Sequence, residues 1–306
     1  MPKIHKVRKH KSSKKNHDKK IDVSNLFFGL IIVALFLFLV PHFVLNSVVL
    51  NIKESKNILI VSDNLDNISR NISLAHISKK PEENLLIILD GNEVIKINEN
   101  YGEYSLGSIY QLLKIDKKND QEIKSVFSNV LNLPIDQFVV LNGVAKDTDN
   151  KQLKKDIFGN FRGKFINPNS LIDVIRLYSL ADSIDISKLN SISEMKEKYN
   201  KLAVIDDQIS EDCSVAVVNT TPTASLAKKV SEIIENMGLQ VVQVESTSFE
   251  FENSTIYYSD DSLGCKKVVD SMSNIFPVVP KVEFSSNMPA NLQFRAKITV
   301  MIGKDF

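Results

Sequence analysis

Asp63 is the side chain in this sequence whose position best suits chemistry. It directly follows residues 57–62 (NILIVS), a short apolar run typical of a β-strand, and α/β folds often place ligand-binding groups at the ends of such strands. Asp66 lies close by, and paired carboxylates can bind a divalent cation or transfer protons. The alternative is that such acids are solvated turn residues, which we favour for the pairs at 206–207 and 260–261. Asp63 is therefore the candidate catalytic and metal-binding residue.

Histidine offers little material for catalysis. Four of the five histidines lie within the first 52 residues (His5, His10, His17 and His42). The fifth, His76, lies in the strand-like run 72–78 (ISLAHIS), where a lone His is more often a packed or surface residue than a base. Ser-His-Asp sites and His-based zinc sites are therefore not expected. The sequence also contains no P-loop, G-x-G-x-x-G or G-x-S-x-G motif.

Two cysteines, Cys213 and Cys265, exclude a disulfide-rich scaffold. Neither has a second Cys or a His nearby in the sequence, which argues against a thiolate metal site. One disulfide bond is possible in an oxidising compartment. We nevertheless expect the two to be unpaired, because one precedes a strand and the other opens a helix after a later strand. That order suggests opposite ends of a sheet.

The net charge of +1 is the sum of two very different parts. Residues 1–20 contain nine Lys and Arg against one Asp, hence +8, while the rest contains 29 Lys and Arg against 36 Asp and Glu, hence −7. The basic stretch could bind RNA or anionic lipid headgroups, but it has no aromatic residue and no motif. We therefore expect it to fix membrane topology, with the lipid bilayer as a partner and no specific nucleic acid.

Residues 23–52 contain no Asp, Glu, Lys or Arg, and their centre reads LFFGLIIVALFLFLVPHFVL. Twenty helical residues span a hydrocarbon core of about 30 Å, so the sequence predicts a transmembrane anchor. A cleavable signal peptide is the competing interpretation, but the run is long for one and no A-x-A-like site follows it. The positive-inside rule then predicts a single-pass protein of the cell membrane, with its N-terminus in the cytoplasm.

The remaining sequence alternates strand-like and helix-like periods, which predicts a mixed α/β fold. Strands are expected at 57–62, 72–78, 84–89, 93–97 and 138–141, and helices around 106–113, 123–131 and 171–178. Residues 142–168 are expected to form a loop or weak hairpin, and 181–210 a connection with one short helix. The predicted fold class is one transmembrane helix followed by two extracytoplasmic mixed α/β domains. Their limits are expected at 1–22 for the tail, 23–52 for the anchor, 53–180 for the first domain, 181–210 for the linker and 211–306 for the second domain.

The second domain has the clearer pattern. Strands are expected at 214–219, 239–244, 254–258, 278–284 and 297–302, with a second helix at 262–275. Thr221 and Pro222 suit the start of the first helix, and Gly238 its end. This order, β-α-β-β-α-β-β, predicts helices packed against one sheet.

Three segments of the second domain form a recognisable pattern: VAVVNTTPTASLAKKVSEIIENMGLQVVQV, STIYYSDD and ITVMIGKDF. Through them, residues from about 211 to 306 resemble the C-terminal domain of LytR-type cell-envelope proteins of bacteria. That family has V-x-V-x-N-x-T at its first strand, then a Leu-Ala helix, a G-hydrophobic-x-V strand and a closing hydrophobic-G-x-D. The corresponding motif positions here are Asn219, Thr221, Gly238 and Gly303.

The region 57–142 is similar to the LytR-CpsA-Psr domain, through SLAHISKKPEENLLIIL, YGEYSLGSIYQLL and NLPIDQFVVLN. This resemblance implies transfer of glycopolymers from a polyprenyl-pyrophosphate carrier to the cell wall, with Arg groups on the pyrophosphate and acids on Mg²⁺. Here Asp63 is retained, but Leu65 replaces the expected Arg and Asn71 the second acid, and Gly91 stands within the segment that reads P-R-D in the family. Developing phosphate charge must be offset by fixed cations, so the resemblance implies a domain that has lost transferase chemistry.

The sequence thus predicts a pseudoenzyme: a membrane-anchored extracytoplasmic cell-envelope protein that binds or scaffolds cell-wall polymer or envelope proteins and needs no cofactor. The alternative is a divergent phosphotransferase that uses Asp63 and Mg²⁺ and gathers several Arg or Lys around that acid. Transcriptional regulation through the tail is disfavoured, because 20 residues cannot build a DNA-reading domain.

Overall fold

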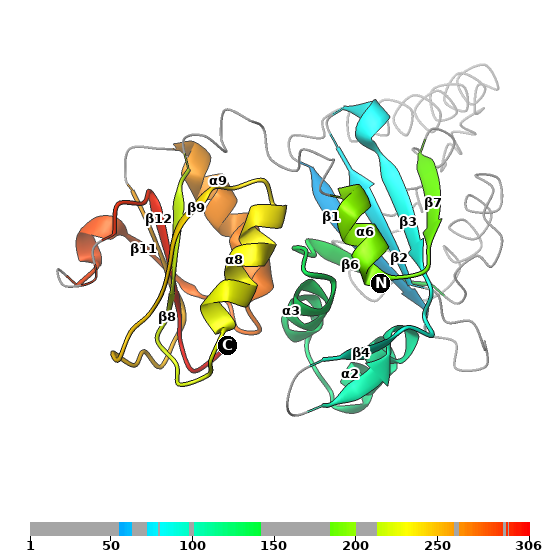
Figure 1. The fold of residues 1–306 in the computed structure, drawn as a ribbon, viewed down its shortest axis with the longest axis horizontal. Coiled ribbons are helices and arrows are strands. Elements are labelled where there is room, and N and C mark those ends of the chain that lie inside the picture. Colours follow the sequence, from blue (N-terminus) through cyan, green and yellow to red (C-terminus); the bar gives the residue numbers. More distant parts are fainter. Residues whose placement is uncertain are drawn as a thin grey trace, which may run out of the picture. The chain divides into compact units, whose positions relative to one another are not determined.

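Two five-stranded β-sheets carry the fold of this computed structural model (Figure 1). The structure describes residues 55–62, 72–78, 80–97, 101–141, 184–199, 213–259, 263–289, 292 and 294–306. We call the described residues up to 199 the N-terminal half and those from 213 onward the C-terminal half. The mixed α/β fold class expected from the sequence is confirmed for both halves.

The N-terminal sheet has the strand order β6-β1-β2-β3-β7. Its strands are β1 (Lys56–Ser62), β2 (Ile72–Ile77), β3 (Leu85–Leu89), β6 (Gln137–Leu141) and β7 (Asp185–Leu189). The central strands β1, β2 and β3 pair antiparallel, while the outer strands β6 and β7 run parallel to their neighbours. Every residue of β2 and β3 is buried, as expected for apolar runs in the middle of a sheet.

Three helices pack against one face of this sheet: α2 (Ile109–Ile115), α3 (Asp120–Leu131) and α6 (Ile192–Tyr199). Helix α3 begins at a capping box, in which Asn119 accepts from the backbone N–H of Glu122 while Glu122 accepts from that of Asn119. Phe127 and Leu131 of α3 and Met195 of α6 are fully buried in the core that these helices form with the strands.

Short elements complete the N-terminal half. They are the hairpin of β4 (Val94–Lys96) and β5 (Glu103–Ser105) and the 3₁₀ turns η1 (Pro81–Glu83) and η2 (Leu106–Ser108). The sequence prediction missed β5, which has only three residues. It also missed β7, which pairs with β3. The segment 181–210 was expected to connect two domains, but its described part, 184–199, adds β7 to the sheet edge and packs α6 on the core. Strand β7 reads DISKL, whose two apolar residues stand three positions apart and so do not show the period-two alternation of a strand. The domain limits as a whole stay a prediction.

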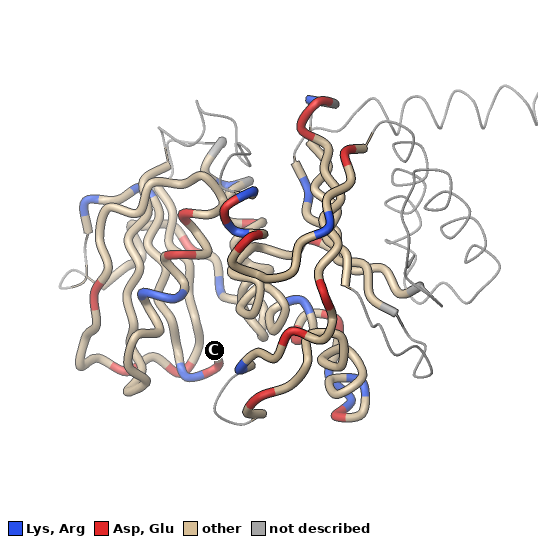
Figure 2. The backbone as a smooth tube through the Cα atoms, turned by 45° about the vertical axis from the view of Figure 1, so that its right-hand side comes forward, with Lys and Arg blue, Asp and Glu red and all other residues tan. Residues whose placement is uncertain are grey.

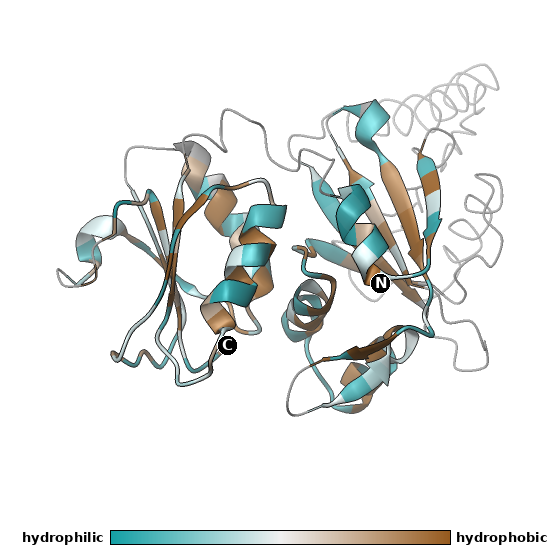
Figure 3. Cartoon of the chain, viewed as in Figure 1, coloured by the Kyte–Doolittle hydropathy of each residue, from teal (hydrophilic) through white to brown (hydrophobic). Residues whose placement is uncertain are grey.

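The C-terminal sheet has the strand order β11-β10-β12-β8-β9. Its strands are β8 (Val215–Asn219), β9 (Val241–Ser246), β10 (Thr255–Tyr258), β11 (Lys281–Phe284) and β12 (Ile298–Ile302). Helices α8 (Leu226–Asn236) and α9 (Leu263–Met272) pack on the same face, and the turn η3 (Ser273–Ile275) extends α9 (Figure 1). Figure 3 shows the apolar stripe of α8 beside its polar one. The predicted order of strands and helices is confirmed.

The opposite face of the C-terminal sheet has a smaller core. Val218, Tyr257 and Met301 are buried there against Met288 and Leu292, beside the 3₁₀ turn η4 (Ser285–Asn287). The edge strands β9 and β11 expose apolar side chains on this half, among them Val242 and Val282.

The start of α8 differs from its prediction. Thr221 and Pro222 were expected to begin the helix, yet α8 begins at Leu226, with Ser225 as its N-cap residue in the left-handed region (φ 64°). The intervening residues form a turn whose hydrogen bonds lead back to Asn219. The predicted end is confirmed, because Gly238 follows the helix with φ 85°, a conformation that favours glycine.

Cys213 and Cys265 form a disulfide bond, with their Cα atoms 5.5 Å apart, so the expectation of unpaired cysteines is wrong. Strand β12 runs parallel to β8 but antiparallel to β10, so the carboxyl end of β10 lies at the amino end of β8. Cys213 directly precedes β8, and Cys265 lies in the first turn of the helix that follows β10. The sequence prediction assumed the wrong relative direction for these two strands.

The predicted anchor at 23–52 lies outside the described residues. Within the part that the structure describes, no helix is both long and apolar enough to cross a bilayer. Residues 142–168 and the predicted helix at 171–178 also lie outside it. Both sheets fall within one compact unit, residues 48–306.

Candidate functional site

The motif residue Asn219 builds the turn that follows β8. It is buried, and its side-chain oxygen accepts from the backbone N–H of Thr221 at 3.0 Å and from the Thr221 hydroxyl at 2.8 Å. The Asn219 amide nitrogen donates to the carbonyl oxygen of Thr223 at 2.7 Å. Asn suits this position because its side chain readily hydrogen-bonds the backbone two residues further on. Asn219 therefore sets the shape of the loop, with its own polar atoms fully engaged inside it.

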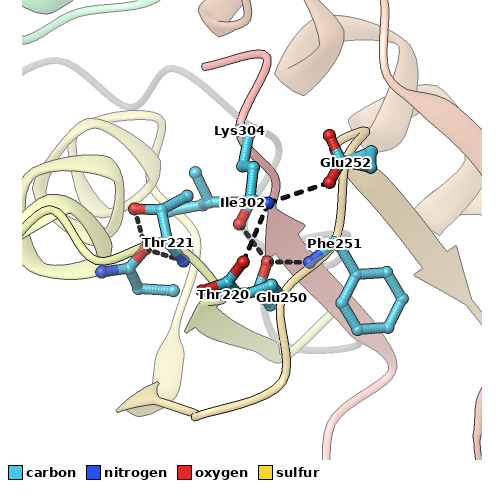
Figure 4. A network of polar contacts seen from close by, with 8 residues as sticks. Thr220, Thr221, Glu250, Phe251, Glu252, Ile302 and Lys304 are labelled. Carbon is cyan, nitrogen blue, oxygen red and sulfur yellow. Dashed lines mark hydrogen bonds and ion pairs between the residues drawn. The ribbon is translucent and has the colours of Figure 1, made fainter.

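Thr220 ties that loop to two neighbouring segments (Figure 4). Its hydroxyl donates to the carbonyl oxygen of Ile302 at 2.7 Å and accepts from the backbone N–H of Phe251 at 3.2 Å. Three segments far apart in the sequence thus meet at the carboxyl ends of the parallel strands β8 and β12. In α/β sheets, this edge is where binding sites commonly form.

Gly303, the second motif glycine, stands where β12 passes against another segment. A Cβ atom at this position would lie 2.4 Å from the carbonyl carbon of Asn253 and 2.6 Å from the nitrogen of Ser254. The Gly303 N–H donates to the Ser254 hydroxyl, and Asp305 accepts from the hydroxyl and the backbone N–H of Ser254. Only glycine permits this close backbone approach.

Lys304 closes the network on its exposed side. Its ammonium group lies 2.8 Å from Glu250 and 2.9 Å from Glu252 (Figure 4). Hydrogen bonding to these two carboxylates raises the pKa of Lys304 above its usual value, and the pKa of Glu250 is correspondingly lowered. Lys304 was not singled out in the sequence analysis, although it lies inside the quoted segment ITVMIGKDF.

A cleft of about 640 Å³ lies beside this network. The C-terminal half lines it with residues that include Thr221, Lys229 and Phe306, and the N-terminal half with residues that include Tyr101 and Asn129. The sequence could not reveal it, because its walls come from segments more than 90 residues apart. Figure 2 shows Lys and Arg interspersed with Asp and Glu along the described chain.

Helix α3 joins the two halves through buried and partly buried hydrogen bonds. The Ser125 hydroxyl donates to the carbonyl oxygen of Ile275 at 2.7 Å, and Gln121 donates to those of Ser273 at 2.9 Å and Phe276 at 2.7 Å. These carbonyls belong to η3 and the residue after it, whose acceptor groups are thereby satisfied. The cleft is thus bounded by directed polar contacts between its two walls.

A second polar network lies inside the N-terminal half, around Asn57. Its side-chain oxygen accepts from the Tyr199 hydroxyl at 2.8 Å and lies 2.9 Å from His76 Nδ1, and its amide donates to the carbonyl oxygen of Pro134. Since that oxygen is an acceptor, the neutral His76 ring carries its proton on Nδ1. His76 Nε2 is buried and has no hydrogen-bond partner among the described residues. Burial lowers the pKa of His76 to about 4, against a smaller opposing effect of Glu83. His76 is a packed residue, as the sequence analysis favoured.

Asp136 connects this network to the junction between the halves. It accepts from the backbone N–H of Asn57 at 2.8 Å and, at 3.4 Å, from the side chain of Asn274, which also accepts from Lys124. Burial raises the pKa of Asp136 to about 6, although the Asn57 hydrogen bond and the charges of Lys56 and Lys124 act in the other direction. The sequence analysis did not single out Asp136, although it lies inside the quoted segment NLPIDQFVVLN.

The candidate catalytic and metal-binding residue Asp63 lies outside the described residues, as do Asp66, Leu65 and Asn71. Gly91 is described: it lies in the turn after β3, and its carbonyl oxygen accepts from the backbone N–H of Gly107. In the described part of the chain, no group of three or more His, Cys, Asp or Glu side chains could hold a metal ion.

Residues 212–306 match the family model LytR_C, described as the LytR cell envelope-related transcriptional attenuator. This part of the chain is therefore a LytR_C domain, and the resemblance of its motifs is confirmed. No curated protein matches the sequence.

Two solved structures of bacterial proteins show distant similarity. A transcriptional regulator from Enterococcus faecalis shares 12% identity over 73% of this chain and 87% of its own, with a TM-score of 0.25. The Lin1025 protein from Listeria innocua shares 11% identity over 68% of this chain and 87% of its own, with a TM-score of 0.22.

Proposed function

We propose that this chain is a membrane-anchored cell-envelope protein whose LytR_C domain and preceding α/β half lie outside the cytoplasmic membrane. The observation that carries the proposal is the Cys213–Cys265 disulfide inside the LytR_C domain. Disulfide bonds form and persist in oxidising compartments and are rare in the cytosol. The charge-free run 23–52, preceded by a stretch of +8, supports the same topology with the N-terminus inside.

We further propose that the protein binds or scaffolds cell-wall polymer or envelope proteins and does not catalyse a reaction. Residues 53–180 would be a LytR-CpsA-Psr-like domain that has lost its chemistry. The replacements at Leu65, Asn71 and Gly91 support this, because a pyrophosphate needs fixed cations around it. The cleft beside the LytR_C motif residues offers a place for binding.

A pair of cysteine variants tests the topology in intact cells, starting from the Cys213→Ala/Cys265→Ala background. Ser12→Cys lies in the basic tail, and Ser248→Cys lies at an exposed position of the C-terminal half. A membrane-impermeant maleimide should label Ser248→Cys in intact cells and Ser12→Cys only after permeabilisation. Equal protection of both, or the reverse pattern, would contradict the proposal. Mass spectrometry of the membrane fraction separates an uncleaved anchor from a cleaved signal peptide.

The alternative function, a phosphotransferase that uses Asp63 and Mg²⁺, stays a prediction. A glycopolymer-transfer assay with a polyprenyl-pyrophosphate donor tests it on the full-length chain. Metal-dependent turnover that disappears in Asp63→Ala would replace the binding role with an enzymatic one.

A further inference from the structure

The cleft between the two halves has the size and lining of a ligand site. Its volume of about 640 Å³ lies within the range of about 300–1,000 Å³ that holds small ligands. Apolar side chains such as Val126 and Leu226 line it together with the aromatic residues Tyr101 and Phe306. Phe306 is held by an edge-to-face contact with Phe276, their ring centroids 5.3 Å apart. Such walls bury the apolar faces of a bound molecule.

Two polar groups of the cleft could meet a hydroxylated ligand. The side-chain oxygen of Asn129 is buried and has no hydrogen-bond partner among the described residues, while its amide nitrogen donates to the backbone of Ser125 at 2.9 Å. A buried acceptor without a donor is costly, so a ligand hydroxyl that donates to it would gain free energy. Thr221 adds a hydroxyl at the wall formed by the LytR_C motif.

Among the described residues that line the cleft, one cation has no acid within ion-pair distance. Lys118 is paired with Glu122 at 2.8 Å, and Lys304 is paired with Glu250 at the same distance. Lys229 lines the cleft half-buried, and no described acid lies within ion-pair distance of its ammonium group. Burial lowers the pKa of Lys229, as does the charge of Lys196, while Glu232 acts in the opposite direction. An anion placed next to Lys229 would offset this desolvated charge.

We propose that this cleft binds a sugar unit with one acidic substituent, with the acidic group at Lys229, a hydroxyl at Asn129 and the ring against the aromatic walls. The inference rests on the proposed binding role and names its ligand class. A single unpaired cation matches one negative charge and would leave a pyrophosphate or a nucleotide largely uncompensated. A lipid chain would leave the side-chain oxygen of Asn129 without a donor.

Isothermal titration calorimetry on the full-length chain in detergent micelles tests the proposal with three probes. They are a hyaluronan disaccharide, which carries one carboxylate, the neutral N,N′-diacetylchitobiose, and inorganic phosphate. We expect the acidic disaccharide to bind at least tenfold more tightly than the neutral one. Phosphate should compete only weakly. No binding of either disaccharide, or equally strong binding of phosphate alone, would overturn the proposal.

Neighbouring lysines on α8 provide a matched pair of variants. Lys229→Gln should lower the affinity for the acidic disaccharide to the level of the neutral one, whereas Lys228→Gln, exposed and outside the cleft, should leave it unchanged. Equal effects of both variants would show only a general electrostatic attraction and would overturn the site. Thr223→Trp should block both disaccharides by filling the rim of the cleft, with Ser248→Trp as its control.

The binding experiment tests the cleft ligand independently of the labelling experiment that tests the topology. A chain that is labelled outside the membrane as expected but binds neither disaccharide would disprove the cleft ligand alone. A chain that binds the acidic disaccharide but shows the reverse labelling would disprove the envelope location alone. Each variant should retain the melting temperature of the parent chain, so that a folding defect is not read as lost binding.

Discussion

The two sheets of this protein are stabilised in different ways. The C-terminal sheet is stabilised by the Cys213–Cys265 disulfide bond and by the close backbone packing at Gly303. The N-terminal sheet instead encloses titratable groups, His76 and Asp136, within hydrogen bonds that converge on Asn57. Stability should therefore depend on steric fit and oxidation in the C-terminal half and on pH in the N-terminal half.

The largest effect is expected from Gly303→Ala, which tests whether the C-terminal half depends on steric fit. The new Cβ atom would meet three backbone atoms of Asn253 and Ser254 at 2.4 to 2.8 Å, and backbone cannot move aside as a side chain can. We expect a loss of more than about 4 kcal/mol or failure of the C-terminal half to fold, measured by denaturant unfolding. Gly102→Ala is the control: its φ is 77° and nothing lies within 4 Å of the added atom, so strain of about 1–2 kcal/mol is expected.

Removal of the disulfide should be the next largest change. The bond joins residues 52 apart in sequence, for which loop entropy gives about 4 kcal/mol in the Cys213→Ala/Cys265→Ala variant. Reduction of the disulfide should lower the free energy of unfolding of the parent chain by a similar amount. The same treatment should leave the free energy of unfolding of the double variant unchanged. A double variant as stable as the oxidised parent would show that the C-terminal sheet does not depend on its covalent clamp.

The pH dependence of the N-terminal half combines two opposing groups. The pKa of His76 is lowered to about 4 in the folded state, so its contribution to stability is present above about pH 6.5 and is lost as the pH falls towards 4. The pKa of Asp136 is raised to about 6, so its contribution is full below about pH 4 and is lost as the pH rises towards 6. Between pH 4 and 6 the two effects should nearly cancel.

Single substitutions should expose each effect in turn. Relative to the parent chain, Asp136→Asn should lose stability as the pH falls from 6.5 to 4, with a slope approaching about 1.4 kcal/mol per pH unit. His76→Gln should gain stability over the same fall below pH 6. Melting temperatures of the full-length chain at pH 4.5, 5.5 and 6.5 check both signs. Parallel curves for all three proteins would contradict the assignment of a titrating core to the N-terminal half.

The smallest effect compares two turns of the same kind. Asn219→Ala removes a buried side chain that makes three hydrogen bonds, so a loss of about 2 kcal/mol is expected. In the N-terminal half, Asp90→Ala removes the exposed hydrogen bond that the Asp90 carboxylate accepts from the backbone N–H of Asn92. This loss should lower the free energy of unfolding by about 0.5 kcal/mol. Equal losses in urea unfolding would show that burial of the Asn219 turn adds nothing.

Local patterns predicted most strands and helices but few of the contacts that matter. Strands such as β3 and β12 read as apolar runs between turn residues, and α3 shows both periodicity and a capping box. The start of α8 was wrong because Pro222 suits a helix start equally well as the turn that Asn219 imposes. The disulfide depends on the relative direction of β8 and β10, which no local pattern contains.

The candidate site was predictable only in part. Asn219 and Gly303 could be found through their motif, since each meets a local demand of loop or backbone geometry. Lys229 and Asn129 could not, because their importance comes from the cleft that forms when two distant segments meet. Asp136 was missed for the same reason, as its raised pKa arises from burial at that junction.

The disulfide closes a covalent ring that contains β8 and β10, yet these two strands do not pair with each other. Strand β12, which lies outside the ring in sequence, separates them in the sheet. A chain truncated before residue 298 would keep both cysteines and lose the strand that holds their two strands in place. Such a truncated product could run as an oxidised species on a non-reducing gel without having a folded domain. For this protein, protease resistance is therefore a better assay of correct folding than disulfide formation.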